Sequence, residues 1–271
     1  MENNAVQNKK ERLIGPDVVR IVACFLVVSV HFFYNNGFYS TPVIGWKMIV
    51  MVFMRNFFMI CVPLFLLLTG YLMRKQQLSK SYYAKGRKTL IIYLLASAAC
   101  IAFRILYEKD SLKRLWGFLS YDGAQYAWYI EMYLGIFMLI PFLNILYNGA
   151  ETKKRKLVLI CTLLSLTSLP GVFNVYCFED ISWWSIPSSS DAYQKLIPAW
   201  WTSLYPFTYY YIGAFVGEYK IKLKPSVNRV LIAACVLISG VYNCWRSKNS
   251  IFVTGTWGSF SSLFVAVMAV L

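Results

Sequence analysis

The chain alternates between long apolar stretches and short segments that carry most of its charge. Runs that contain no Lys, Arg, Asp or Glu occupy positions 21–33, 61–73, 90–103, 157–169 and 231–241. Several extend to about 20 residues with tolerant flanks, the length at which a helix crosses about 30 Å of hydrocarbon. This pattern predicts an all-α transmembrane bundle of eight spans, near residues 17–35, 48–73, 89–107, 127–147, 157–174, 200–217, 229–245 and 255–271.

Composition agrees with a membrane protein and excludes a soluble one. Hydrophobic residues make up 58% and charged residues 14% of the 271 positions, against about 25% charged in soluble domains. The net charge of +15 would suggest nucleic-acid binding in a soluble protein. Here the basic residues lie between apolar runs, so we attribute them to membrane topology and anionic lipid headgroups. We expect the lipid bilayer, and no nucleic acid, as a partner.

The distribution of basic residues predicts the orientation of the chain. Alternate connecting segments hold 17 Lys and Arg on one side and 7 on the other. Because the richer side faces the cytoplasm, residues 1–16 become a cytoplasmic tail, and residues 17–271 form the transmembrane domain. Tyr and Trp gather at span ends, at 182–185, 199–201 and 209–211, as an interfacial belt does. We expect a multi-pass protein of the plasma membrane.

Cysteine usage gives no sign of a metal site. The seven cysteines form no CxxC pair, and the chain has one histidine, so no metal is expected. Five cysteines lie inside apolar runs and are predicted to be small buried hydrophobes. These are Cys24, Cys61, Cys100, Cys161 and Cys235.

Three ionisable side chains lie in the first predicted span, where such groups are costly and suggest function. At about 100° per residue, Arg20 and His31 are three turns apart to within about 20°, and Asp17 is about 40° short of four turns from His31. The three groups therefore share one helix face. Arg20 and His31 are separated by about 16 Å along the axis, which suits an elongated ligand with an anionic group at its cytoplasmic end.

Each of these groups has two interpretations. His31 is able to take a hydroxyl proton near neutral pH and return it to a leaving thiolate; alternatively, it is an interfacial residue at the outer end of the span. Arg20 binds an anionic group; alternatively, its side chain extends to the cytoplasmic interface. Spacing by itself leaves these alternatives open.

The run from Asp17 to His31, with Arg three positions after Asp and His eleven after Arg, resembles the first-span signature of the membrane acyltransferase 3 family. Two further stretches are similar to that family. Residues 62–73 resemble its second-span pattern of Pro, Phe and a small residue before Gly, and residues 128–141 resemble its Trp-aromatic segment ending in Pro. The resemblance covers about residues 15–271.

The resemblance implies an enzyme that moves an acyl group, commonly acetyl from acetyl coenzyme A, to hydroxyls of cell-surface carbohydrates. It implies His31 as general base and Arg20 as a group on the cofactor side, while Asp17 either orients Arg20 or completes the start of the helix. Arg87 and Lys88 would attract the phosphates of a donor that enters from the cytoplasm; alternatively, they are ordinary positive-inside residues. No serine or cysteine nucleophile is expected.

Departures from the family pattern concern the binding residues most. Lys88 stands where the family usually has Arg, Ile92 where Pro is common, and Tyr126 where His often precedes the Trp. Glu131 occupies a position that is more often aromatic or apolar, and it either contacts sugar or lies at the interface. We expect substrate binding by the start of this segment, at Trp128, Tyr129 and Glu131.

Two other functions remain open. Some relatives of this fold are attributed polysaccharide export, although the predicted spans offer few polar groups for a continuous path. A non-catalytic membrane module is the other alternative, which the paired Arg20 and His31 argue against. The family has about ten spans, so we expect this chain to lack the last helices. The envelope substrates imply a bacterial source.

Overall fold

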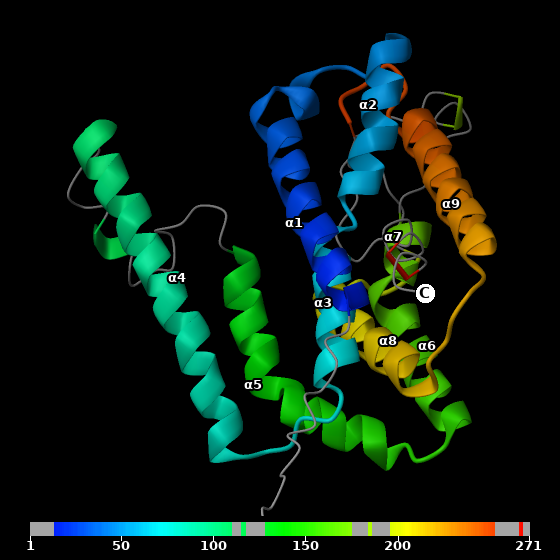
Figure 1. Cartoon of the computed structure of the whole chain (residues 1–271). Coiled ribbons are helices and arrows are strands. Elements are labelled where there is room, and N and C mark those ends of the chain that lie inside the picture. Colours follow the sequence, from blue (N-terminus) through cyan, green and yellow to red (C-terminus); the bar gives the residue numbers. More distant parts are fainter. Residues whose placement is uncertain are drawn as a thin grey trace, which may run out of the picture. The chain divides into compact units, whose positions relative to one another are not determined.

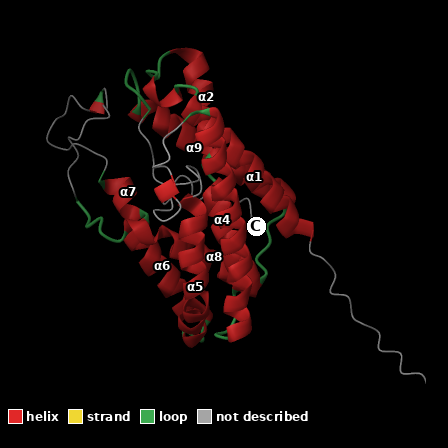
Figure 2. Ribbon diagram, turned by 90° about the vertical axis from the view of Figure 1, so that its left-hand side faces the viewer, coloured by secondary structure: helices red, strands yellow, loops and turns green. Residues whose placement is uncertain are grey.

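The computed structural model describes residues 14–109, 115–117, 128–174, 184–185, 196–252 and 266–267. Within these residues the chain is helical, with two isolated bridges, Pro42–Ile251 and Val43–Lys248, and no strand. The all-α class is therefore confirmed (Figures 1 and 2). The elements are α1 (Ile14–Asn35), η1 (Phe38–Ser40), α2 (Gly45–Phe58), α3 (Cys61–Met73), α4 (Lys80–Tyr107), α5 (Trp128–Gly149), α6 (Lys153–Thr167), α7 (Leu169–Phe173), η4 (Thr202–Leu204), α8 (Tyr205–Tyr219) and α9 (Pro225–Arg246).

Five segments are long and apolar enough to cross a membrane: Ile14–Asn35, Gly45–Met73, Lys80–Tyr107, Trp128–Gly149 and Pro225–Arg246. All five overlap predicted spans. Helices α6 and α8 overlap the predicted spans 157–174 and 200–217, but each has 15 residues, short of the usual 20 or so. The last predicted span, 255–271, lies outside the described residues except at 266–267. A count of eight and the N-terminal orientation stay predictions.

Local sequence signals explain where several helices begin. Ser79 precedes α4, and its side chain accepts a hydrogen bond from the Tyr82 amide. Thr152 caps α6 in the same way through the Arg155 amide. Such N-caps satisfy amides that have no partner within the helix. Pro225 opens α9, where its fixed φ and missing N–H are tolerated.

The predicted span 48–73 is two helices rather than one. Helix α2 ends at Phe58 and α3 begins at Cys61, with Met59 and Ile60 between them. Pro63 lies in the first turn of α3, where a residue without an N–H is accommodated. Proline therefore accounts for a helix that ends and restarts within one apolar run.

The chain divides into two compact units. Unit 1 comprises Met1–Leu68, Gly171–Lys195 and Lys222–Leu271; unit 2 comprises Thr69–Pro170 and Leu196–Ile221.

Unit 1 is built around the packing of α2 against α9. A Cβ at Gly240 would overlap the ring of Phe53, so glycine is what lets the two helices approach. Beside it, the Asn243 side-chain amide donates to Asn56 Oδ1 at 3.0 Å, and both residues are buried. Small residues and interhelical amide hydrogen bonds of this kind join membrane helices. An aromatic and aliphatic core lies at one end of the unit and comprises Phe33, Phe38, Val43, Met48, Val52 and Phe252.

Unit 2 holds α4, α5, α6, α8 and the end of α3. A Cβ at Gly70 would overlap the Tyr210 carbonyl, and one at Gly86 would lie 2.7 Å from the Phe137 ring. These glycines bring α3 close to α8 and α4 close to α5. Pro141 lies inside α5, which changes direction along its length in Figure 1, as proline-containing helices do.

The predicted burial of the five cysteines is wrong for most of them. Cys61 is buried and Cys235 is half-buried, whereas Cys24, Cys100 and Cys161 are exposed. A helix side that faces lipid is as apolar as one that faces protein, so hydropathy does not separate the two. The sequence therefore did not show which surface these thiols face.

Candidate functional site

Asp17 and Arg20 form an ion pair in the first two turns of α1. Arg20 Nη1 donates to Asp17 Oδ1 at 2.7 Å, and the two side chains are 48% and 27% exposed, respectively. The N-terminal end of a helix also favours the Asp17 carboxylate. An exposed pair of this kind contributes about 1 kcal/mol or less to stability. The contact places the guanidinium of Arg20 beside the Asp17 carboxylate.

The imidazole of His31 has a defined tautomer. Its Nδ1 lies 2.8 Å from the carbonyl oxygen of Val27, one helical turn earlier. A carbonyl oxygen only accepts hydrogen bonds, so we assign the proton to Nδ1. In the neutral ring, Nε2 then carries the lone pair. The helix therefore holds His31 in the form that a general base requires, with Nε2 as the basic atom.

The polar stripe of α1 flanks its buried face. The buried residues of α1 are Ala23, Leu26, Val30 and Phe33. At 100° per residue, the centre of this face lies roughly 120° around the helix from His31. His31 is half-buried as a result, while Arg20 is exposed. The stripe predicted from spacing is thus present on a continuous helix, at the border between packed and accessible surface.

In unit 2, the first turns of α5 gather aromatic and acidic groups. The Tyr93 hydroxyl of α4 donates to Glu131 Oε1 at 3.5 Å. The Trp128 and Tyr129 rings are 6.3 Å apart, and Tyr129 is stacked against Tyr133 at the same separation. Glu131 therefore accepts a hydrogen bond from a phenol and shares the first turns of α5 with an indole, a setting in which a carboxylate is able to bind hydroxyls.

Arg87 and Lys88 lie in the third turn of α4, and both are exposed. Their neighbour Gly86 packs on Phe137, which is six residues beyond Glu131 and so about 9 Å along α5. Along the axis of α5, the two cations therefore lie near Phe137 and not near the first turn. Exposed cations on a rigid helix attract phosphates, and they also fit a positive-inside role.

The predicted residues fall into two groups, one in each unit. The first, in unit 1, contains Asp17, Arg20 and His31, and the second, in unit 2, contains Arg87, Lys88, Trp128, Tyr129 and Glu131. Within the described ranges, no cluster of three His, Cys, Asp or Glu side chains is arranged to hold a metal ion.

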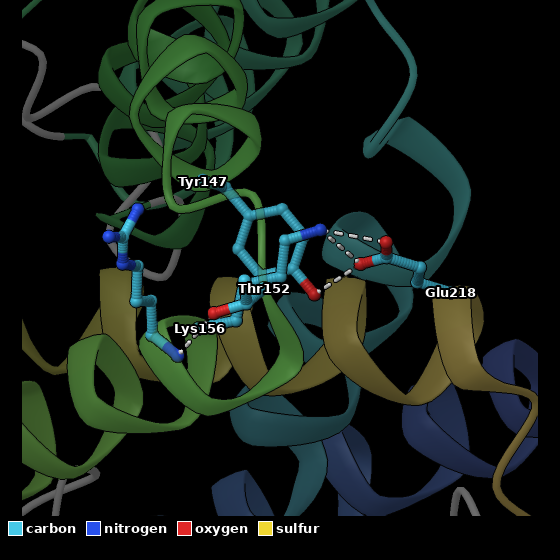
Figure 3. A network of polar contacts seen from close by, with 5 residues as sticks. Tyr147, Thr152, Lys156 and Glu218 are labelled. Atoms are coloured by element: carbon cyan, nitrogen blue, oxygen red, sulfur yellow. Dashed lines mark hydrogen bonds and ion pairs between the residues drawn. The ribbon is translucent and has the colours of Figure 1, made fainter.

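A partly buried polar network in unit 2 escaped sequence reasoning. Lys156 Nζ donates to both oxygens of Glu218, at 2.7 and 2.9 Å, and the Tyr147 hydroxyl donates to Oε2 at 2.7 Å. Figure 3 shows the three side chains converging from α6, α8 and α5. The Lys156 side chain is only 5% exposed, and its ammonium lies 4.5 Å from the Tyr147 ring centroid. The network joins three helices at one point.

The network fixes the charge of Glu218. Burial raises the pKa of Glu218, but hydrogen bonds from Lys156 and Tyr147 and the charges of Lys156 and Arg74 outweigh burial, so the pKa is lowered. In the sequence, Lys156 is one of four consecutive basic residues between the predicted spans 127–147 and 157–174, the kind of cluster that the positive-inside rule explains. No spacing rule connects side chains more than 60 positions apart, so hydropathy and charge gave no signal for this contact.

The chain was compared with known proteins. A family model described as an acyltransferase domain, the acyltransferase 3 type, matches residues 13–271. No curated protein and no solved structure gives a significant match. The match covers nearly the whole sequence, including the Asp17, Arg20 and His31 stripe. Together with the five helices long enough to cross a bilayer, it shows that the chain is a multi-pass membrane protein of the acyltransferase 3 family.

Proposed function

We propose that this membrane acyltransferase transfers an acetyl group from acetyl coenzyme A to a hydroxyl of a cell-envelope polysaccharide or its lipid-linked precursor. The observation that carries the proposal is the geometry of α1. His31 is held with Nε2 as its basic atom, on the same helix face as the Asp17–Arg20 ion pair. A base and a cation at opposite ends of one stripe suit an elongated, anionic donor.

In the proposed reaction, His31 Nε2 accepts the proton of the acceptor hydroxyl. The hydroxyl oxygen forms the new ester bond with the acyl carbon as the thioester bond breaks. The proton then passes from His31 to the departing thiolate, so the ring returns to its starting state. The hydrogen bond from Nδ1 to Val27 keeps the ring oriented throughout.

The remaining residues supply binding in this proposal. Arg20, fixed by Asp17, would lie beside the donor at the predicted cytoplasmic end of α1, and Arg87 and Lys88 would attract its phosphates. Glu131 with Trp128 and Tyr129 would contact the sugar, because aromatic faces and carboxylates suit sugar rings and hydroxyls. The bundle would lie in the bacterial plasma membrane.

The test uses membranes that contain the chain, incubated with acetyl coenzyme A labelled in the acetyl group and with envelope polysaccharide. We expect label on the polysaccharide that mild base releases as acetate, because the product is an ester. Label that resists mild base would contradict O-acetylation. No label in any product, with the protein folded in the membrane, would favour polysaccharide export.

A further inference from the structure

Arg55 is a buried cation inside a candidate membrane span. It lies on α2, is 4% exposed, and belongs to the segment Gly45–Met73. Arginine stays protonated in proteins, and a charge at this depth is costly unless a partner compensates it. Its role was not apparent from the sequence, which placed it only within or near a span.

The described residues give Arg55 aromatic partners but no acidic one. Its Nε donates to the Tyr39 hydroxyl at 3.2 Å. The guanidinium carbon lies 4.6 Å from the Phe252 ring centroid and 5.7 Å from that of Tyr39. None of the carboxylates that the structure describes forms an ion pair with it. Cation–π contacts offset part of the cost of burying the guanidinium charge, but they use none of the N–H donors on its two terminal nitrogens.

The terminal nitrogens of the Arg55 guanidinium lack an acidic partner among the described residues. No described residue accepts a hydrogen bond from the two terminal nitrogens of Arg55. Neither nitrogen is completely sealed from the surface. Their hydrogen-bonding capacity is therefore left for an acceptor that the described residues do not supply. Two parallel N–H groups on a rigid plane match the two oxygens of a carboxylate or phosphate.

The residues that contact Arg55 come from connecting segments at one end of unit 1. Tyr39 lies in η1 after α1, and Phe252 follows α9. The two segments are joined where the Val43 amide donates to the Ser250 carbonyl at 2.9 Å. At membrane depth, non-helical backbone occurs where it is buried in protein or lines a polar cavity. The guanidinium of Arg55 therefore lies against connecting segments of the protein, through Tyr39 and Phe252.

The same end of α1 carries His31. Tyr34 lies one turn beyond His31 on α1, and its ring centroid is 6.3 Å from that of Tyr39, the residue that binds Arg55. The aromatic pair Tyr34 and Tyr39 thus connects the neighbourhood of the proposed base to the buried guanidinium.

We infer that Arg55, held by Tyr39 and Phe252, is an anion-binding subsite for the acceptor, so the acceptor carries a carboxylate or phosphate near the hydroxyl that is acylated. This inference rests on the proposed function, because only the proposed acyl transfer makes the bound anion an acceptor. The anion site itself is defined by the contacts of Arg55.

Binding is tested on the purified protein in detergent with three matched probes: glucose, glucuronic acid and glucose 1-phosphate, at constant ionic strength. We expect both anions to raise the melting temperature while glucose does not, because ligand binding to the folded state stabilises it. The probe that gives the larger shift distinguishes an acidic sugar from a sugar phosphate. Equal shifts from glucose and the two anions would overturn the inference.

Variants assign the effect to Arg55. Arg55→Gln should weaken binding of the preferred anion by about tenfold or more, since it removes the charge and the paired donors. Lys47→Gln, which removes an exposed cation from the same helix, should leave binding unchanged. If Arg55→Gln does not fold, Arg55→Lys keeps the charge but loses the fork, and it should still bind more weakly than the natural protein. An anion shift as large as that of the natural protein in either Arg55 variant would refute the site.

The transfer assay separates this inference from the proposed function. With the preferred anionic sugar as acceptor, Arg55→Gln should raise KM with little change in kcat, and it should not alter transfer to glucose. If no transfer occurs with any acceptor but Arg55-dependent anion binding is observed, the anion site stands and the proposed reaction fails. If transfer occurs and Arg55→Gln has no effect on KM, the reaction stands and the anion site fails.

Discussion

The Tyr82 hydroxyl donates a 2.6 Å hydrogen bond to the carbonyl of Phe137, the carbonyl that Pro141 leaves without its usual helical donor. An α-helix pairs each amide with the carbonyl four residues earlier, and proline has no amide hydrogen. The Tyr82 ring also stacks on the Phe137 ring at 4.5 Å. Helix α4 therefore supplies the partner that the kink in α5 removes.

Replacing Tyr82 with Phe should lower the free energy of unfolding by about 1 to 3 kcal/mol, because the Phe137 carbonyl is left buried without a donor. Thermal unfolding in detergent measures the loss. Tyr83→Phe is the matched control, since its longer 3.2 Å bond to the Met138 carbonyl is exposed.

The double variant Tyr82→Phe, Pro141→Ala should recover part of that loss, because alanine restores the helical donor to Phe137. Additive effects of the two substitutions would contradict the proposed link between the kink and the tyrosine.

A second prediction concerns glycines. Gly70→Ala should destabilise unit 2 strongly, since the new Cβ would overlap the backbone carbonyl of Tyr210 and a backbone atom cannot move aside cheaply. Gly135→Ala on α5 has open space around its new Cβ, so stability should stay constant or rise slightly. Melting temperatures of both variants provide the check. Equal effects at the two positions would show that α3 and α8 do not approach as described.

The helices illustrate what the sequence was able to predict. Apolar runs located α1, α4, α5 and α9 because burial in lipid requires a continuous apolar length. The start of α4 was placed nine residues late, at 89 rather than Lys80. The first turns of α4 are rich in Lys and Arg and extend beyond the apolar stretch, so hydropathy does not detect them, although the Ser79 cap is visible in the sequence.

The candidate site was only partly accessible to sequence reasoning. The Asp17, Arg20 and His31 stripe follows from helical periodicity, which is a local property of one element. The partners of Glu218 and Arg55 come from helices and loops far away in sequence, and single-sequence patterns carry no information on such contacts. The tautomer of His31 likewise required the position of the Val27 carbonyl.

A third prediction uses the lowered pKa of Glu218. The ionised Glu218 carboxylate contributes fully to stability above its ordinary pKa of 4.5. This contribution is lost as the pH falls through the lower pKa that Glu218 has in the folded state. The melting temperature should therefore decline at acidic pH, and Glu218→Gln should reduce that decline. Lys156→Met should destabilise the protein more than Lys154→Met, because Lys156 is buried against Glu218 whereas Lys154 is exposed. The opposite order would contradict the network.

A fourth prediction concerns the cation of α1. Asp17→Asn should raise the KM for acetyl coenzyme A several-fold, because Arg20 loses the partner that positions it, and Arg20→Gln should raise it further. Glu108→Gln removes the partner of Arg104 in an ion pair of the same helical kind and should leave KM unchanged. Similar values for all three variants would contradict a role for Arg20 in donor binding.

The most direct test of His31 as the base is the rate of labelled acetyl transfer in membranes at matched protein levels for the natural chain, His31→Gln and Ser29→Ala. Glutamine keeps a polar group of similar reach but cannot take up a proton. Ser29 contacts the carbonyl four residues earlier, as His31 does, but lies roughly 160° around α1 from His31. We predict a loss of about 10²- to 10⁴-fold for His31→Gln and a rate close to that of the natural chain for Ser29→Ala. Transfer by His31→Gln at a rate near that of the natural chain would contradict the account.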